Sequence, residues 1–217
     1  LILKFIKSRR LHKINQMKSR ILIAIFLLTN YFSFAQFKFG FTIGVQSSSV
    51  KIVNYVTEPR LSLNAGIAAL APLAEGIDIQ LQLLVSGKGY KYYDSYGYKN
   101  LMRPLYLELP IAVRFKFNST TNTKIFLGAG GYYAIGIGGN QTYYISGIKE
   151  TQKINYGNSS SDDLVQSDLG LVFQLGADFR ENYEGYFFYD MGLTKNIPNT
   201  TSNSFNRVFG FNLAWYF

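Results

Sequence analysis

The chain has 217 residues, 47% of them hydrophobic and 17% aromatic, and a formal net charge of +9. The charge is concentrated at the start, because residues 1–35 hold seven of the 22 basic residues and none of the 13 acidic ones. Residues 36–217 keep 15 basic and 13 acidic residues, a net charge of +2, so the composition gives no indication of a nucleic-acid partner.

Residues 1–35 predict a cleavable signal peptide. Met17–Arg20 is a short basic start, Ile21–Leu28 is an apolar run, and Ser33–Ala35 supplies the small residues of a cleavage site. An uncleaved membrane anchor is the alternative, but the apolar run is too short to cross a bilayer as a helix. Residues 1–16 begin with Leu rather than Met, and we expect them to be an upstream mis-start.

The chain has no cysteine, and its single histidine, His12, lies within the predicted signal region. Residues 36–217 therefore lack the residue types of most nucleophile–base pairs and of most zinc or haem sites. The sequence predicts no catalytic residue, no cofactor site and no metal site, and we expect the protein not to be an enzyme.

Eight segments of alternating apolar and less apolar residues predict β-strands. In Leu105–Phe117, every second residue is apolar over thirteen residues, longer than the usual strand of a soluble protein and long enough to cross a bilayer at a tilt. The predicted strands are Lys38–Gln46, Leu61–Leu70, Ile77–Gly89, Leu105–Phe117, Lys124–Gly138, Gln166–Phe179, Gly185–Thr194 and Asn206–Phe217.

The connections between these segments alternate between long and short. The long ones are Ser47–Arg60, Tyr90–Met102, Gly139–Val165 and Lys195–Phe205, and the short ones are Ala71–Gly76, Asn118–Thr123 and Arg180–Glu184. Transmembrane barrels show this asymmetry, with short periplasmic turns and longer external loops. Residues 36–217 are therefore predicted to be one all-β domain, an eight-stranded antiparallel up-and-down transmembrane β-barrel, and a monomer.

A soluble lipocalin-like barrel or a β-sandwich would also alternate, so the less apolar face decides between the classes. In Lys124–Gly138 this face carries glycines beside Phe126 and Tyr132, which suits a narrow filled interior better than a wet surface. Charges of both signs lie on the same face of the strands, and we expect an interior ion-pair network rather than an acid–base pair or a Ca²⁺ site. The charged residues are Asp78, Lys88, Glu108, Arg114, Lys116, Asp168, Asp178 and Asp190.

Two features complicate the pattern. Pro110 lies mid-strand and cannot donate a ladder hydrogen bond, so we expect a bulge or a weakened seam there.

Lys88–Lys99 is rich in tyrosine, and we expect a hairpin above the membrane that holds its tyrosines at the interface, with contact to a ligand or glycan as the alternative. Nucleic-acid stacking is disfavoured for an exported protein. The tyrosines are Tyr90, Tyr92, Tyr93, Tyr96 and Tyr98.

Several segments resemble the outer-membrane β-barrel family of Bacteroidetes that is called PorT-like or porin family. They are Leu105–Phe117, Lys124–Gly131, Asp168–Phe179, Tyr189–Asn196 and Asn206–Phe217. The resemblance implies the outer membrane of a Gram-negative cell, with lipid and lipopolysaccharide around the barrel. It also implies that Phe217 is an assembly signal for the barrel assembly machinery.

From these patterns we expect a structural or surface-interaction role, in which the four external loops meet a surface ligand or a partner protein. The alternatives are an accessory component of a type IX-like secretion system and a narrow passive pore for small solutes. Side chains that fill an eight-stranded interior disfavour the pore.

Overall fold

The computed structural model describes residues 37–52, 57–93, 98–120, 122–145, 148–180, 182–198 and 204–217. The chain divides into two units, Leu1–Gln36 and Phe37–Phe217, and all described residues belong to the second. The predicted signal peptide and Tyr96 lie outside the described residues. Within the described part, no helix is long and apolar enough to cross a membrane.

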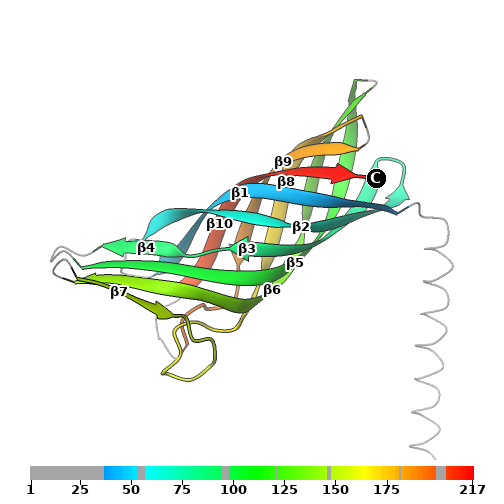
Figure 1. Cartoon of the computed structure of the whole chain (residues 1–217). Coiled ribbons are helices and arrows are strands. Elements are labelled where there is room, and N and C mark those ends of the chain that lie inside the picture. The colour runs from blue at the N-terminus through cyan, green and yellow to red at the C-terminus, as the bar shows by residue number, and fades with distance from the viewer. Residues whose placement is uncertain are drawn as a thin grey trace, which may run out of the picture. The chain divides into compact units, whose positions relative to one another are not determined.

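The described residues form ten β-strands (Figure 1). They are β1 (Lys38–Ile52), β2 (Glu58–Ala74), β3 (Ile77–Gly87), β4 (Tyr90–Tyr93), β5 (Lys99–Thr120), β6 (Thr123–Ile145), β7 (Ile148–Lys153), β8 (Ser167–Phe179), β9 (Tyr183–Gly192) and β10 (Ser204–Tyr216). All strand pairs are antiparallel, and β10 pairs with β1 to close the sheet into a ring.

The ring has eight wall positions, which confirms the predicted eight-stranded antiparallel barrel. β4 pairs with β2 and β5, as β3 does, so it continues the wall position of β3 after a break at Lys88 and Gly89. Among the described strands, β7 pairs with β6 alone and adds a strand outside the ring. The two additional strands therefore leave the size of the barrel unchanged.

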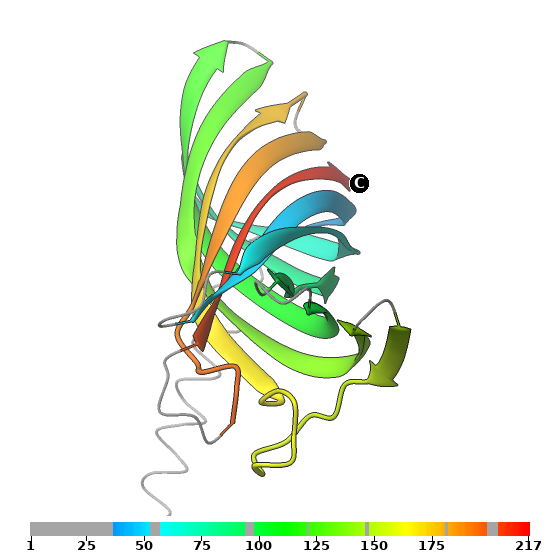
Figure 2. The same ribbon diagram turned by 90° about the vertical axis from the view of Figure 1, so that its left-hand side faces the viewer.

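The strands are longer than the hydrophobic alternation predicted, and this corrects the predicted loops. β5 has 22 residues and β6 has 23, so Tyr90–Met102 and Gly139–Val165 contain strand as well as loop. Tilted strands of about 10 residues cross a bilayer, so the remaining residues of β5 and β6 extend beyond it. There the outward face no longer needs to be apolar, and the alternation ends although the ladder hydrogen bonds continue. Figure 1 shows β4 to β7 extending beyond the other strands at one end, and Figure 2 looks onto that end.

The other connections are also shorter than predicted, because the strands beside them continue into the predicted loops and turns. β1 and β2 take up most of the predicted loop Ser47–Arg60, β2 runs into the predicted turn Ala71–Gly76, and β9 begins inside Arg180–Glu184. The ends of β5 and β6 take up most of Asn118–Thr123, and β10 begins at Ser204 inside Lys195–Phe205.

The barrel is apolar outside and polar inside. Exposed outward side chains include Phe41, Ile67, Leu83, Ile111, Leu127, Phe173, Phe187 and Leu213, and buried inward ones include Thr42, Gln80, Gln82, Gln174, Tyr186 and Asn212. Because neighbouring residues of a strand point to opposite faces, most apolar residues at the lipid are followed by a polar, aromatic or small residue inside, with Leu84 and Val172 among the exceptions. This is the arrangement of a lipid-embedded barrel.

Pro110 interrupts one seam of the wall. The ladder between β3 and β5 pairs Leu81 with Ile111 and Leu84 with Glu108, but no pair forms at the two intervening positions. The register is the same on both sides of the gap, so there is no bulge. The expected weakened seam is therefore present, and its cause is the missing N–H of the proline.

Candidate functional site

A charged cluster around Arg114 fills the interior near the short turns, which mark the periplasmic end. The Arg114 cluster consists of Arg114, Asp78, Glu184, Lys116 and Asp178. Strand register places Asp78 of β3 opposite Arg114 of β5. The guanidinium binds Asp78 through two hydrogen bonds, Nε to Oδ1 at 2.6 Å and Nη2 to Oδ2 at 2.9 Å, and its Nη1 lies 2.7 Å from Glu184 Oε1.

Neighbouring groups complete this cluster. Lys116 Nζ lies 2.7 Å from Asp78 Oδ2 and 2.5 Å from Asp178 Oδ2. Arg114 Cζ lies 4.4 Å from the centre of the Phe126 ring, so an aromatic face covers the guanidinium. A buried charge pair is tolerated when its donors and acceptors find partners, and each of the three guanidinium nitrogens of Arg114 has a carboxylate partner.

A second charged cluster lies toward the external end. The Lys88 cluster consists of Lys88, Glu108, Asp168 and Asp190. Lys88 Nζ lies 3.0 Å from Glu108 Oε2 and 3.4 Å from Asp168 Oδ2, and it lies 4.2 Å from the centre of the Tyr132 ring. Lys88 sits in the break between β3 and β4, where Gly89 adopts a φ of 123° that favours glycine.

Neutral donors contribute to the Lys88 cluster as well. The Tyr132 hydroxyl donates to Asp168 Oδ2 at 3.0 Å, and Asn206 Nδ2 donates to the same oxygen at 2.8 Å. Asp190 lines the same part of the interior as Glu108. The cluster therefore holds three carboxyl groups around one ammonium group. The neutral O–H and N–H groups of Tyr132 and Asn206 supply hydrogen bonds that a second cation would otherwise provide.

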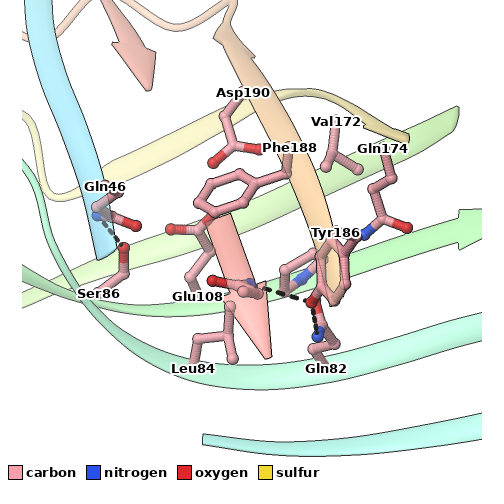
Figure 3. A pocket seen from close by; sticks show the side chains of 12 residues that line it. Gln46, Gln82, Leu84, Ser86, Glu108, Val172, Gln174, Tyr186, Phe188 and Asp190 are labelled. Atoms are coloured by element: carbon pink, nitrogen blue, oxygen red, sulfur yellow. Dashed lines mark hydrogen bonds between the residues drawn. The ribbon is translucent and has the colours of Figure 1, made fainter. Parts of the chain in front are cut away.

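Between the two clusters lies a cavity of about 10 Å³, enough for one water molecule (Figure 3). Glu108 and Asp190 face it from one side and Tyr186 from the other. The Tyr186 hydroxyl accepts hydrogen bonds from Gln82 Nε2 at 2.6 Å and from Asn212 Nδ2 at 3.0 Å. Side chains thus fill the barrel at this level.

The segment 154–166 covers the external mouth of the barrel. Its residues Ile154 and Leu164 are buried in one cluster with Val50, Tyr90 and Met102. The backbone N–H of Val165 donates to Asn196 O at 2.8 Å, which joins this segment to the β9–β10 connection. The longest predicted loop is therefore partly folded back onto the barrel.

Tyr156 anchors this cover. Its ring packs edge-on against Tyr106 with centroids 5.9 Å apart, and its hydroxyl donates to Gly138 O at 2.8 Å. A Cβ atom at Gly136 would lie 2.1 Å from Tyr156 Cε1, so only glycine leaves room for the ring. The position of the Tyr156 ring thus depends on the glycine at 136.

The predicted external tyrosines fall into separate environments. Tyr90 is only 8% exposed and belongs to the cluster under the cover, so its side chain is not presented to an external ligand. Tyr93 is 42% exposed, and Lys99 Nζ lies 5.1 Å from its ring centre. Tyr92 and Tyr98 have ring centroids 6.4 Å apart. These tyrosines therefore do not form one continuous binding surface.

The structure places all eight predicted interior charges inside the barrel. Sequence reasoning missed Glu184, which it assigned to a turn, and Tyr156, which it assigned to a loop. Extending the inward series Asp190, Phe188 and Tyr186 by one more step would have found Glu184. No alternation signals Tyr156, because it lies outside the strands.

Phe217 follows β10 at the periplasmic end and is exposed. Its backbone N–H donates to Phe39 O at 2.8 Å, and its ring lies near those of Phe41 and Trp215.

The described part of the chain brings together no group of three or more acidic or histidine side chains that could hold a metal ion.

The closed ring, the apolar outer wall and the ion-paired interior define an integral outer-membrane β-barrel protein. The family described as outer membrane protein beta-barrel domain matches residues 30–197, and the chain belongs to it. No curated protein matches the chain.

Solved structures of other outer-membrane proteins are similar in a distant way. The attachment invasion locus protein Ail of Yersinia pestis is 12% identical, covering 83% of this chain and 98% of its own, with a TM-score of 0.45. Neisserial surface protein A is 12% identical, covering 82% and 97%, with a TM-score of 0.43. OprG from Pseudomonas aeruginosa is 12% identical, covering 83% and 94%, also at 0.43. Similarity this distant assigns no ligand or activity.

Proposed function

We propose that this protein is a surface-interaction barrel whose binding element is the extracellular sheet, defined as β4, residues 99–104 of β5, residues 139–145 of β6, and β7. The observation that carries the proposal is the length of β5 and β6, 22 and 23 residues, about twice what a bilayer requires. The residues beyond the membrane form ordered strands, which can present side chains in fixed positions.

The tip of this sheet has the properties of a contact surface. Ile148 is 73% exposed, Ile145 is also exposed, and all six residues of β7 are exposed. Within the described residues β7 pairs only with β6, so its other edge offers free backbone groups that can accept an added strand. Lys99 Nζ lies 5.1 Å and 5.3 Å from the ring centres of Tyr93 and Tyr144, so a cation and two tyrosines lie together at this tip.

The packed interior favours this role over a passive pore for small solutes. A water-sized cavity lies between the charged clusters, and 154–166 covers the mouth. We expect no stable single-channel steps when the purified protein is inserted into planar bilayers. Regular steps that disappear when the protein is omitted would favour the pore instead.

The binding role is tested by replacing residues 141–152 with Asn-Gly, which joins the paired residues Asn140 and Lys153 through a two-residue turn. A photo-crosslinking amino acid at Ile148 should give a discrete adduct on intact cells, whereas the same group at Glu75 in a periplasmic turn should not give that adduct. Cells that carry the shortened hairpin should lose the bound partner while the barrel still folds. A partner that is retained by the shortened protein would contradict the proposal.

We also propose the finer placement in the PorT-like branch, supported by segments such as Tyr189–Asn196. The expected partners are then lipopolysaccharide around the barrel and the barrel assembly machinery, which would read Phe217. Co-purification of the full-length protein with secretion components would favour the type IX-like alternative. A Phe217→Ser variant that reaches the outer membrane in normal amounts would argue against the assembly signal.

A further inference from the structure

A cationic hollow lies on the outer wall of the barrel, just above the apolar band. It has a volume of about 480 Å³ and is lined by Arg60, Lys91 and Arg103, together with Ser47, Pro59, Leu61 and Leu101. The three cations come from β2, β4 and β5. Because they are distant in sequence, the barrel fold alone brings them together.

The break between β3 and β4 creates this hollow. β3 ends at Gly87, and β4 pairs with β2 only through Glu58 with Lys91 and Pro59 with Tyr90. Arg60 Nη1 reaches into the break and donates to Lys88 O at 2.8 Å. The Arg60 side chain is thus held at the wall by one of its five N–H groups, and it lines the hollow.

The charge in the hollow is not balanced by its surroundings. Among the residues that the structure describes, no ion pair joins Arg60, Lys91 or Arg103 to a carboxylate. Within the described part of the chain, the acidic residue in register with the hollow is Glu58, which faces Lys91 across the ladder, so three positive charges there meet one negative charge. Arg60 and Arg103 line the same hollow, so their like charges repel each other, a cost that a bound anion would relieve.

The height of the hollow indicates where the anion comes from. Leu61 and Leu105 are exposed outward residues at the external edge of the apolar band, and Arg60 and Arg103 lie one and two residues beyond them. Two residues of a strand span about 6.6 Å, less when the strand is tilted. The cations therefore lie at the level of the lipid headgroups in the outer leaflet.

We infer that the hollow binds a phosphate group carried by a lipid of the outer leaflet. Arg60 and Arg103 would bind the phosphate oxygens through their N–H groups, and Lys91 would add a third charge. The acyl chains would lie along the apolar wall below, where Leu61 and Leu105 begin the band. The hollow shares Lys91, Leu101 and Arg103 with the extracellular sheet, but it lies at the base of that sheet and faces the membrane, so its lipid ligand is distinct from the proposed partner at the tip.

Lipid titrations followed by native mass spectrometry of the detergent-purified full-length protein test the site. The probes are diphosphorylated lipid A, the same lipid A after enzymatic removal of its phosphates, phosphatidylglycerol and phosphatidylcholine. We expect one tightly bound molecule of diphosphorylated lipid A, weaker binding of the dephosphorylated form, and no preference for phosphatidylcholine over detergent. Phosphatidylglycerol binding as tightly as lipid A would identify a phospholipid as the source of the same phosphate.

The variant K91Q/R103Q removes two charges and keeps Arg60, whose hydrogen bond to Lys88 supports the wall. Near a membrane surface each basic residue contributes enough that the loss of two should weaken binding by roughly 30-fold. The control is Lys149→Gln, which removes a cation from β7 away from the hollow and should leave lipid binding unchanged. The single variant R103Q provides a second readout if the double variant folds poorly.

Inorganic phosphate distinguishes a lipid site from a site for the free ion. At concentrations matched to the lipid, it should not displace lipid A. Displacement by inorganic phosphate would overturn the lipid assignment. Equal affinity of the wild type and K91Q/R103Q for diphosphorylated lipid A, or equal affinity for its dephosphorylated form, would overturn the phosphate site itself.

Discussion

The two interior clusters satisfy their carboxylates in different ways. The Arg114 cluster joins two cations to three carboxylates, and the guanidinium binds Asp78 with paired hydrogen bonds. The Lys88 cluster has one cation for three carboxylates, and tyrosine and asparagine donors provide the rest. In the periplasmic half of the barrel, the planar guanidinium of Arg114 thus binds the carboxylates in a fixed geometry. In the external half, the carboxyl groups share the single ammonium group of Lys88.

The largest expected effect is that of Arg114→Met. The substitution removes the hydrogen bonds to Asp78 and Glu184 and leaves both carboxylates buried, which should cost about 4 to 5 kcal/mol. The measurement is urea unfolding in lipid vesicles followed by the fluorescence of Trp215, the only tryptophan. If Arg114→Met lowered the free energy of unfolding by less than Lys88→Met does, the Lys88 cluster would be the more stabilising of the two.

Lys88→Met should cost less, about 3 kcal/mol, in the same unfolding experiment. Three carboxyl groups lose their cation, but Tyr132 and Asn206 still donate to Asp168. Adjacent carboxyl groups can also take up a proton, which relieves part of the repulsion. The matched control is Lys149→Gln on the exposed β7, which should leave the free energy of unfolding unchanged.

Asp190→Asn sharpens the comparison in the opposite direction. The substitution removes one of three carboxyl groups around a single ammonium group and lets an amide donate to Glu108. We expect no loss and a gain on the order of 1 kcal/mol in the free energy of unfolding, because like charges a few ångströms apart repel in a poorly solvated interior. A marked destabilisation would mean that the Asp190 charge has a partner role of its own. The comparison variant Asp78→Asn should destabilise, since Asp78 accepts from Arg114 and Lys116.

Lys116→Met should have the smallest effect of the four. The Lys116 side chain is 18% exposed, whereas that of Arg114 is fully buried. Water therefore reaches its ion pairs, and we expect a loss of at most about 1 kcal/mol. Raising the salt concentration should shrink the difference between Lys116→Met and the wild type while leaving the Arg114→Met difference nearly unchanged.

Strand alternation was sufficient to predict the barrel, its orientation and the inward position of the charges. It could not predict which charges meet, because Asp78 and Arg114 become neighbours only through the register between β3 and β5. Glu184 was missed because the polar residues around it resemble a turn, although hydrogen bonding already begins at Tyr183. The extracellular sheet and Tyr156 were missed because strands outside lipid, and segments outside strands, have no apolar period to detect.

The gap in strand pairing at Pro110 affects where the barrel wall first opens locally. The seam where β1 meets β10 is continuous over 13 residue pairs, whereas the seam between β3 and β5 is interrupted in its middle. Amide deuterium uptake in micelles should therefore begin around Gln82 and Leu83, far from the junction of the first and last strands. The barrel is closed by pairing its first and last strands, but it would then begin to open at the interrupted pairing of β3 and β5.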